Sequence, residues 1–164
     1  MSVALVPVKP ADAALHARWL ADPEVARFRT ARYPLSGTTI AASLAGDERT
    51  TQFTVVAGGE RIGYAALRRS HHVENRGAEA DLLLGARRGE GLGTAAARAL
   101  CAYGFGTLGL HRVSAWVVAG NAAALRTGAR AGFADEGTSR HRLYRDGRYL
   151  DCVLLGLLAG EWRP

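Results

Sequence analysis

Lysine is nearly absent from this sequence, because only Lys9 among its 21 basic residues is a lysine and the others are arginines. The net charge of +6 would suggest a nucleic-acid or membrane partner if it were concentrated in one place. The excess is instead spread along the chain, without a basic tail or block. We therefore expect no nucleic-acid partner, and the arginine-rich composition is typical of a GC-rich coding genome.

Long apolar runs are also missing. The longest, Cys152–Gly160, falls far short of the roughly 20 residues that span a bilayer. The N-terminus places its short apolar run directly after Met1 and Ser2, which is typical of a first strand and not of a signal peptide. These features predict a cytoplasmic protein with no membrane partner.

Cysteine is scarce, and the two residues present, Cys101 and Cys152, lack any metal-ligand spacing. We interpret them as incidental thiols, although one disulfide between them stays open. His71 and His72 with Glu74 have no evident third ligand, so we expect no metal site.

What the sequence does contain is enough apolar material for one core: 48% of its 164 residues are hydrophobic. We expect a single domain over 1–164. Hydrophobic periodicity and turn residues predict the following strands: 3–8, 52–57, 61–69, 79–85, 111–118, 133–144 and 148–158. They predict these helices: 11–20 with Asp12 as a cap, one starting at 22–24, 36–44, 91–107 and 121–131. This order indicates an α+β fold, a mixed α/β domain with strand–helix–strand crossovers only in its second half.

A glycine-rich turn joins the strand at 79–85 to the helix at 91–107, in the sequence LLLGARRGEGLGT over 82–94. Glycines let a ligand approach the main chain, and free amides at a helix N-terminus attract an anion. Arg87 and Arg88 add donors suited to phosphate oxygens. The spacing fits neither the Walker pattern nor the dinucleotide fingerprint. A pyrophosphate site is the functional interpretation, and a turn that binds nothing is the alternative.

The segment Arg88–Gly93 matches each fixed position of Arg/Gln-x-x-Gly-x-Gly/Ala, the cofactor motif of the GNAT superfamily of acetyl-CoA-dependent N-acetyltransferases. Further segments are similar to sequences of this superfamily: Ala78-Glu79, 109–113, Asn121 and 145–151. Together these segments resemble the branch that contains the ribosomal-protein N-terminal alanine acetyltransferases (RimJ/RimL-like). The resemblance covers nearly the whole chain.

The resemblance implies a mixed sheet of about seven strands, flanked by helices and splayed between its fourth and fifth strands. The co-substrate would be acetyl-CoA, without a metal. By this analogy main-chain groups of Leu82, Leu83 and Leu84 would meet the pantetheine arm, as would Asn121, and Arg126 would reach the adenosine phosphate end. The residues implied to hold the pyrophosphate are Arg87, Arg88, Gly89, Gly91, Leu92, Gly93 and Thr94.

An acetyl thioester is already activated, so transfer to an amine needs mainly positioning, a base and oxyanion stabilisation. Glu79, at the start of the strand before the loop, is the candidate base, and an exposed strand-end carboxylate is the alternative interpretation. Asp81 is the second candidate, because it shares a face with Glu79 if the strand is regular. A β-bulge, which is common in this family here, would break that equivalence.

Three departures from the resemblance put a side-chain general acid in doubt: Gly128 replaces a frequent Tyr, Ala124 a frequent Ser and Ala95 a frequent Glu. Tyr144, Tyr64 and Tyr103 are substitute acids, although each is better interpreted as a packing residue. The leading prediction is therefore an N-acetyltransferase for a primary amine, either a small molecule or a protein N-terminus. The alternative is a catalytically degenerate acyl-CoA-binding module.

The acceptor and the assembly stay open at this level. A polycationic acceptor is favoured by four acids in the N-terminal half: Asp22, Glu24, Asp47 and Glu48. An anionic acceptor is favoured by the nearby arginines Arg27, Arg29 and Arg32. The chain is expected to be a monomer or a homodimer, since the last strand could pair across a dimer through Leu154, Leu155, Leu157 and Leu158.

Overall fold

The computed structural model describes residues 2–29 and 37–164. One seven-stranded sheet forms its centre, in the order β1-β2-β3-β4-β5-β7-β6. The strands are β1 Ala4–Pro7, β2 Thr50–Ala57, β3 Glu60–Arg69, β4 Gly77–Leu84, β5 Arg112–Val118, β6 Ala134–Arg145 and β7 Arg148–Leu158. The helices are α1 Ala13–Ala21, α2 Pro23–Ala26, α3 Gly37–Ala45, α4 Leu92–Gly106 and α5 Ala122–Ala131, with 3-10 turns η1 Pro10–Asp12 and η2 Val73–Asn75. No described helix is long and apolar enough to cross a membrane.

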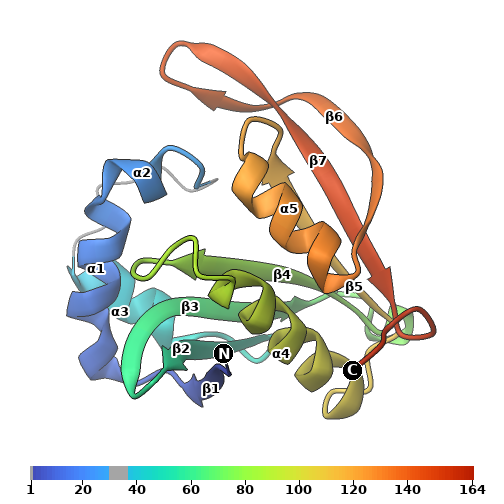
Figure 1. Ribbon diagram of the computed structural model, residues 1–164, viewed down its shortest axis with the longest axis horizontal. Coiled ribbons are helices and arrows are strands. Elements are labelled where there is room, and N and C mark those ends of the chain that lie inside the picture. Colours follow the sequence, from blue (N-terminus) through green and yellow to red (C-terminus); the bar gives the residue numbers. More distant parts are fainter. Residues whose placement is uncertain (1, 30–36) are drawn as a thin grey trace.

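All neighbouring strands run antiparallel except β4 and β5, which are parallel. The β4–β5 ladder holds only three residue pairs and ends at Glu79 and Ser114, although both strands continue beyond it. Figure 1 shows β4 and β5 diverging from this point. The mixed α+β fold and the splay between the fourth and fifth strands are therefore confirmed.

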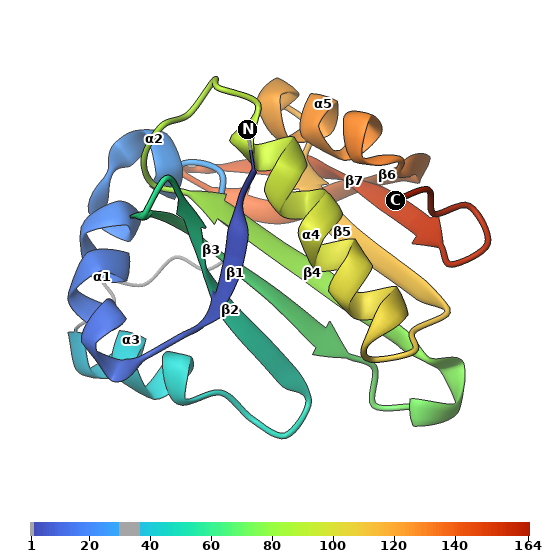
Figure 2. The same ribbon diagram turned by 60° about the horizontal axis from the view of Figure 1, so that its bottom comes forward.

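Two apolar clusters hold the layers together. The larger lies between the sheet and α4, where Leu92, Ala96 and Leu100 pack against strand residues that include Ile62 and Val113. Figure 2 shows α4 crossing one face of the sheet with α5 beside it. A smaller cluster, Trp19, Val25 and Leu83, joins α1 and α2 to β4. Burial of such side chains contributes about 1.5–3 kcal/mol each, so both clusters fix the position of β4.

The two predicted hairpin turns are confirmed. Gly58 and Gly59 connect β2 to β3 with φ of +59° and +81°, and Asp146 and Gly147 connect β6 to β7 with φ of +50° and +79°. Left-handed backbone at both positions is the two-residue turn that suits the twist of a hairpin. Gly132 likewise ends α5 with φ of +102°, as predicted.

Asp12 does not cap α1, contrary to the prediction. Its carboxylate is buried and accepts hydrogen bonds from Lys9 N at 3.0 Å and Thr54 Oγ1 at 3.0 Å, and Arg61 Nε lies 2.9 Å away. The reason is that the chain first forms η1, so the Asp12 side chain turns toward β2 and β3. It thereby anchors the start of α1 to the sheet.

The final strand is not available for pairing across a dimer. β7 lies inside the sheet, with β5 on one side and β6 on the other, so both of its edges are used within the chain. Leu155 and Leu157 are buried within the fold. The sheet order, which β7 enters between two earlier strands, is what overturns that prediction.

Candidate active site where β4 and β5 separate

Main-chain groups of β4 become available where β5 diverges. Gly85 N donates to Ile62 O at 2.9 Å, and pairing alternates along an antiparallel ladder, so the odd-numbered residues of β4 bond to β3. Leu82 and Leu84 then direct their N–H and C=O groups toward the side that β5 has left. The register favours these two over Leu83 for main-chain contacts, while the Leu83 side chain packs on Trp19.

The glycine loop follows β4 directly. A Cβ on Gly85 would lie 2.0 Å from the ring of Trp19, so glycine allows α1 to pack against the loop. Arg87, Gly89 and Gly91 all adopt left-handed φ, of +52°, +91° and +77°. A Cβ at Gly89 or at Gly91 would meet nothing within 4 Å, so the loop surface there is open. The turn that the sequence predicts is thus present.

The N-terminus of α4 emerges from this loop with unpaired main-chain donors. Its intrahelical bonds begin with the one from Ala95 N to Gly91 O at 3.3 Å, so the amides of Leu92, Gly93 and Thr94 precede them. Such amides and the helix dipole favour an anion. A fifteen-residue helix with an open glycine surface before it fits a phosphate group.

The two arginines of the loop already have carboxylate neighbours. Arg87 NH2 lies 2.6 Å from Glu90 Oε2, and Arg88 NH2 lies 2.7 Å from Asp22 Oδ2. The hydrogen bond from Arg87, followed by the charge of that guanidinium, lowers the pKa of Glu90 below its ordinary value. Anion binding by Arg88 would therefore compete with Asp22, which also accepts a hydrogen bond from Glu24 N at the start of α2.

Helix α5 lies beside the N-terminal turn of α4. A Cβ on Gly93 would come 3.4 Å from Thr127 Oγ1, so the two helices are in close contact. Asn121 caps α5 by accepting from Ala124 N at 3.1 Å, which leaves its amide nitrogen for another partner. Arg126 is exposed on the same helix. Both predicted residues thus lie on the helix that adjoins the loop.

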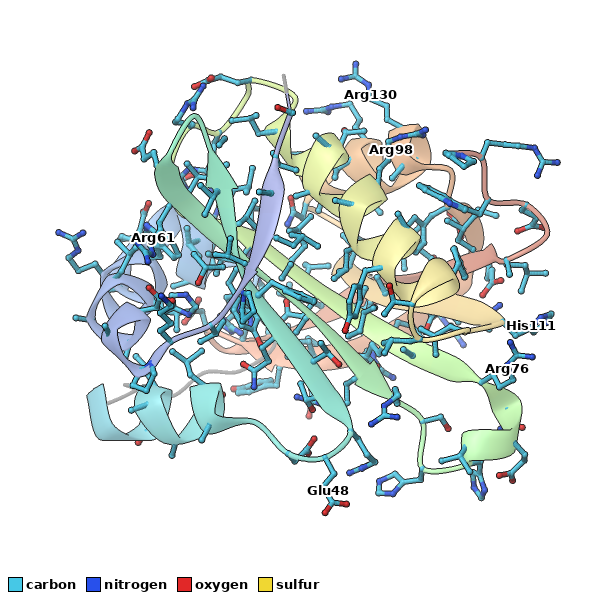
Figure 3. The ribbon with its side chains drawn as sticks, turned by 90° about the horizontal axis from the view of Figure 1, so that it is seen from below. Glu48, Arg61, Arg76, Arg98, His111 and Arg130 are labelled. Carbon is cyan, nitrogen blue, oxygen red and sulfur yellow. The ribbon has the colours of Figure 1, made fainter. Side chains whose placement is uncertain are left out.

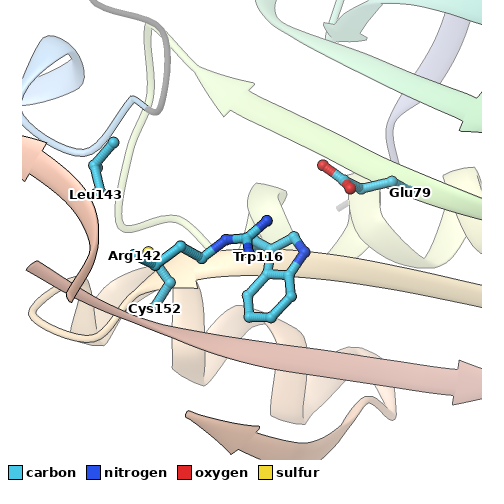
Figure 4. Close-up of a pocket in the computed structure, with 5 residues that line it drawn as sticks. All are labelled: Glu79, Trp116, Arg142, Leu143 and Cys152. Atoms are coloured by element: carbon cyan, nitrogen blue, oxygen red, sulfur yellow. The ribbon is translucent and has the colours of Figure 1, made fainter. Parts of the chain in front are cut away.

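A pocket of about 430 Å³ borders the region where β4 and β5 separate. Its lining comes from four strands: Glu79 of β4, Trp116 of β5, Arg142 and Leu143 of β6, and Cys152 of β7. Figure 4 shows the Glu79 carboxylate extending from β4 toward the side of the pocket where Arg142 lies over Trp116. The guanidinium carbon of Arg142 is 3.7 Å from the ring centroid.

The two candidate bases have different surroundings. Within the described part of the chain the Glu79 carboxylate is exposed and has no hydrogen-bond or ion-pair partner. The Asp81 carboxylate is bound at both oxygens by Arg29, at 2.5 and 2.7 Å. No register shift occurs in the β3–β4 ladder, so the two carboxylates share a face. Of the two candidate bases, Glu79 is the one that lines the pocket, and Asp81 is the one that Arg29 binds.

None of the three tyrosines considered as general acids lines this pocket. Tyr64 donates to Gln52 Oε1 at 2.9 Å, and burial followed by the charge of Asp81 raises its pKa. Tyr103 packs edge-on against Phe53 in the core, and Tyr144 is exposed beside Tyr149. Each contact is one that a packing or surface residue makes.

Gly128 occupies the position where many superfamily members have a tyrosine that acts as general acid. A Cβ there would lie 2.5 Å from Cδ1 of the buried Leu155, so a side chain at this position would require Leu155 to move. The departure seen in the sequence is thus built into the packing of this chain.

Sequence reasoning did not identify Trp116, Arg142 and Leu143 as pocket residues, and it interpreted Cys152 as an incidental thiol. Burial raises the pKa of the Cys152 thiol, so it stays protonated at neutral pH. Arg142 reaches the pocket because β6 is irregular: its pairing with β7 shifts between Ser139 and Leu143. No sequence pattern predicts that shift, because the residue with left-handed backbone in this segment, His141 with φ of +53°, is not a glycine.

The sequence matches the family described as "Acetyltransferase (GNAT) domain" over residues 2–134. Among curated proteins, the "Putative ribosomal N-acetyltransferase YdaF" of Bacillus subtilis is 40% identical over 74 residues, which are 45% of this chain and 40% of that protein. The spermidine N(1)-acetyltransferase of Escherichia coli K12 is 29% identical over 117 residues, 71% of this chain and 62% of that protein. The chain thus matches less than two thirds of the length of either relative.

Solved structures give the same result. Mycobacterium smegmatis RimJ in complex with CoA-disulfide superposes with a TM-score of 0.86 at 26% identity, over 97% of this chain and 83% of that one. A Vibrio cholerae spermidine N-acetyltransferase in complex with CoA and spermine reaches 0.86 at 20% identity, over 98% and 97%, which shows the fold. YdaF and RimJ are consistent with the resemblance to the RimJ/RimL-like branch. Because the family match spans most of a chain whose strands separate beside a glycine loop, this chain belongs to the GNAT acetyltransferase family.

Proposed function

We propose that this protein transfers the acetyl group of acetyl-CoA to a primary amine. The carrying observation is the end of the β4–β5 ladder at Glu79 and Ser114. The Glu79 carboxylate stands at this end of the ladder without a partner among the described residues, and the main chain that follows it leads to the glycine loop. The CoA named with RimJ, a structure of the same fold, supports this assignment.

The residues present fit the extended, anionic shape of acetyl-CoA. Main-chain groups of Leu82 and Leu84 would bond the pantetheine arm, as strands bond to an added strand. The amides of Gly89–Thr94, together with Arg87 and Arg88, would hold the pyrophosphate. Asn121 and Arg126, on the adjoining helix α5, would contact the pantetheine arm and the adenosine phosphate end.

When bound, acetyl-CoA supplies a thioester carbonyl that is already activated toward an amine. The chain contributes a base and a position for that amine. Glu79 accepts the proton that the amine nitrogen loses as its bond to carbon forms, directly or through one water. Main-chain N–H groups on the unpaired side of β4 stabilise the oxyanion. A thiol with a pKa of about 8.5 leaves without a strong acid, which fits the absence of a tyrosine at Gly128.

The test is release of CoA thiol from acetyl-CoA over a panel of amines that includes peptide N-termini and small amines. We expect Glu79→Gln to lower kcat/KM by about 10²–10⁴-fold and to leave the dissociation constant of acetyl-CoA, measured by calorimetry, within about twofold. Glu48→Gln is the matched control, because Glu48 lies in the turn before β2, at the periphery of the molecule in Figure 3. Full activity in Glu79→Gln would contradict the role of Glu79.

The second candidate function is an acyl-CoA-binding module without transfer activity. It is favoured by Gly128, Ala124 and Ala95, where relatives with the full motif carry reactive side chains. Binding of acetyl-CoA by the natural chain with no amine consumed from the panel would support it.

Free, buried Cys101 and Cys152 accord with the cytoplasmic location that we propose.

A further inference from the structure

The acids that would attract a polycationic acceptor are engaged or lie elsewhere. Asp22 pairs with Arg88 at the glycine loop, and Glu24 pairs with Arg27 at 3.0 Å. Asp47 accepts hydrogen bonds from the turn that precedes β2, at 2.7 Å from Thr50 Oγ1 and 3.0 Å from Arg49 N. None of these three lines the pocket that contains Glu79.

Glu48, the fourth such acid, is no closer. It lies in the same turn before β2, where its carbonyl accepts a hydrogen bond from Arg69, and it does not line the pocket. Figure 3 shows its side chain projecting outward at the margin of the molecule. Of the arginines weighed against these acids, Arg32 lies outside the described residues, and Arg29 neutralises Asp81 beside the pocket.

Positive charge predominates on the opposite wall. The β6–β7 hairpin carries four arginines and two aspartates over 140–151. Arg145 is buried, and its guanidinium donates to the main-chain carbonyls of Ala26 and Arg29, which are neutral acceptors. Arg142 lies in the pocket itself and contacts the face of Trp116. Among the described residues no carboxylate pairs with Arg142 or Arg145.

We propose that the acceptor is a small amine that carries an anionic group, a carboxylate or a phosphate, and that Arg142 binds this group. The inference rests on the proposed acetyl transfer. A guanidinium stacked on a tryptophan is held in one plane, with its donors free to meet an anion in a bidentate way. Glu79, on the other wall, attracts the amine. The pair therefore recognises one charge of each sign, within a volume typical of small-molecule sites.

The same arrangement disfavours a polyamine. Spermidine carries several positive charges and no anionic group, so it would leave Arg142 unpaired and place a like charge beside it. The named activity of the Escherichia coli relative therefore does not extend to this pocket.

The experiment compares matched acceptors at equal concentrations of neutral amine. The pairs are O-phosphoethanolamine with ethanolamine and β-alanine with β-alaninamide, and spermidine is the polycation. We expect the anionic member of at least one pair to exceed its neutral partner and spermidine by about tenfold or more in kcat/KM. Whether phosphate or carboxylate is preferred identifies the group.

Arg142→Gln should reduce that preference to within about twofold, through a loss of kcat/KM that is larger for the anionic amines than for the neutral ones. Arg142→Lys should restore part of it, because the charge returns without the planar fork. Arg98→Gln is the matched control. Arg98 also lies over a tryptophan, Trp162 at 5.2 Å, but on α4, away from the pocket. Its variant should keep the full preference.

Spermidine as the best acceptor, acetylation of peptide N-termini only, or no preference within either pair would overturn the inference and leave acetyl transfer standing. So would an Arg142→Gln variant whose loss lies in the affinity for acetyl-CoA, measured by calorimetry, because Arg142 would then serve the co-substrate. If acetyl-CoA binds and no amine is consumed at all, the proposed function falls first and this inference with it.

Discussion

The glycine loop and the pocket around Glu79 both adjoin the separated strands β4 and β5, and they are built differently. The loop is one continuous segment, 85–94, whose proposed ligand-binding groups are mostly main-chain amides beside glycines. The pocket takes its side chains from β4, β5 and the β6–β7 hairpin, and these lining residues extend from Glu79 to Cys152 in the sequence. In the proposed assignment, recognition of the co-substrate therefore uses groups that are local in the chain, and recognition of the acceptor depends on tertiary structure.

The two regions also differ in how their charges are balanced. Arg87 and Arg88 of the loop have Glu90 and Asp22 as neighbours, so a phosphate must share or displace a carboxylate. In the pocket, Glu79 and Arg142 have no ionic partner among the described residues. A charged ligand in the pocket would form new ion pairs without breaking existing ones. We therefore expect added salt to lower the affinity for a ligand at the loop and the affinity for a ligand in the pocket by different amounts.

Breaking the loop should have the largest effect on this comparison. Gly91→Val places a β-branched residue at φ of +77°, which costs about 1–2 kcal/mol, and it projects a side chain into the open surface before α4. We expect acetyl-CoA affinity, measured by calorimetry, to fall by at least about 100-fold, with the chain still folded by circular dichroism.

Gly147→Val is its matched control. Gly147 has nearly the same φ, +79°, and an equally open Cβ position, but it lies in the β6–β7 turn. We expect similar strain with acetyl-CoA affinity kept within about threefold. Equal losses of affinity in both variants would mean that strain, and not the loop amides, decides co-substrate binding.

A change of intermediate size tests the contact between α5 and β7, which adjoins both regions. Restoring the tyrosine that relatives carry, as Gly128→Tyr, should not create a general acid, because Leu155 occupies the space. We expect a loss of about 1–3 kcal/mol in the free energy of urea unfolding and no gain in kcat. A stable and faster Gly128→Tyr enzyme would show that the helix can move away.

Gly106→Ala serves as the reference for that measurement. It is also a helical glycine, but a Cβ there meets nothing within 4 Å. We expect it to be neutral or to stabilise by about 0.5–1 kcal/mol.

The smallest effect should come from Asp12, which supports α1 and belongs to neither region. Burial alone would raise the pKa of its carboxyl, but the hydrogen bonds from Lys9 and Thr54 and the charge of Arg61 bring that pKa below its ordinary value. A group with a lowered folded-state pKa stabilises the fold above its unfolded-state pKa, about 3.9, and loses this contribution as the pH falls through the folded-state value.

Asp12→Asn should therefore lower the free energy of unfolding by about 1–2 kcal/mol at pH 7, and the difference from the natural chain should shrink below about pH 4. Acetyl-CoA affinity should not change. A difference that stays constant from pH 7 to pH 3 would indicate that packing, and not the carboxylate charge, is lost.

Local patterns predicted most of the elements correctly, because turns and caps depend on neighbouring residues. The Gly58-Gly59 and Asp146-Gly147 turns and the Gly132 helix end are examples. The role of Asp12 and the place of β7 were predicted wrongly. Asp12 binds Thr54, 42 residues away, and β7 inserts between β5 and β6, so both depend on which distant segments meet. The Glu79 and loop assignments stay predictions that the variants above test.

By itself the sequence determined the glycine loop, because the glycines, the two arginines and the start of the following helix lie within about ten residues of one another. The conformation of such a turn depends on neighbouring residues and needs no contact with a distant segment. It also predicted that Glu79 and Asp81 share a face if the strand is regular, and the unbroken β3–β4 register shows that the strand is regular. Only the tertiary structure decided that Arg29 binds Asp81 and leaves Glu79 without a partner. It also decided that Arg142 meets Trp116 in the pocket. These residues are far apart in the sequence. Which of them meet depends on the order of the strands in the sheet and on the irregular pairing of β6, and no short sequence pattern predicts either.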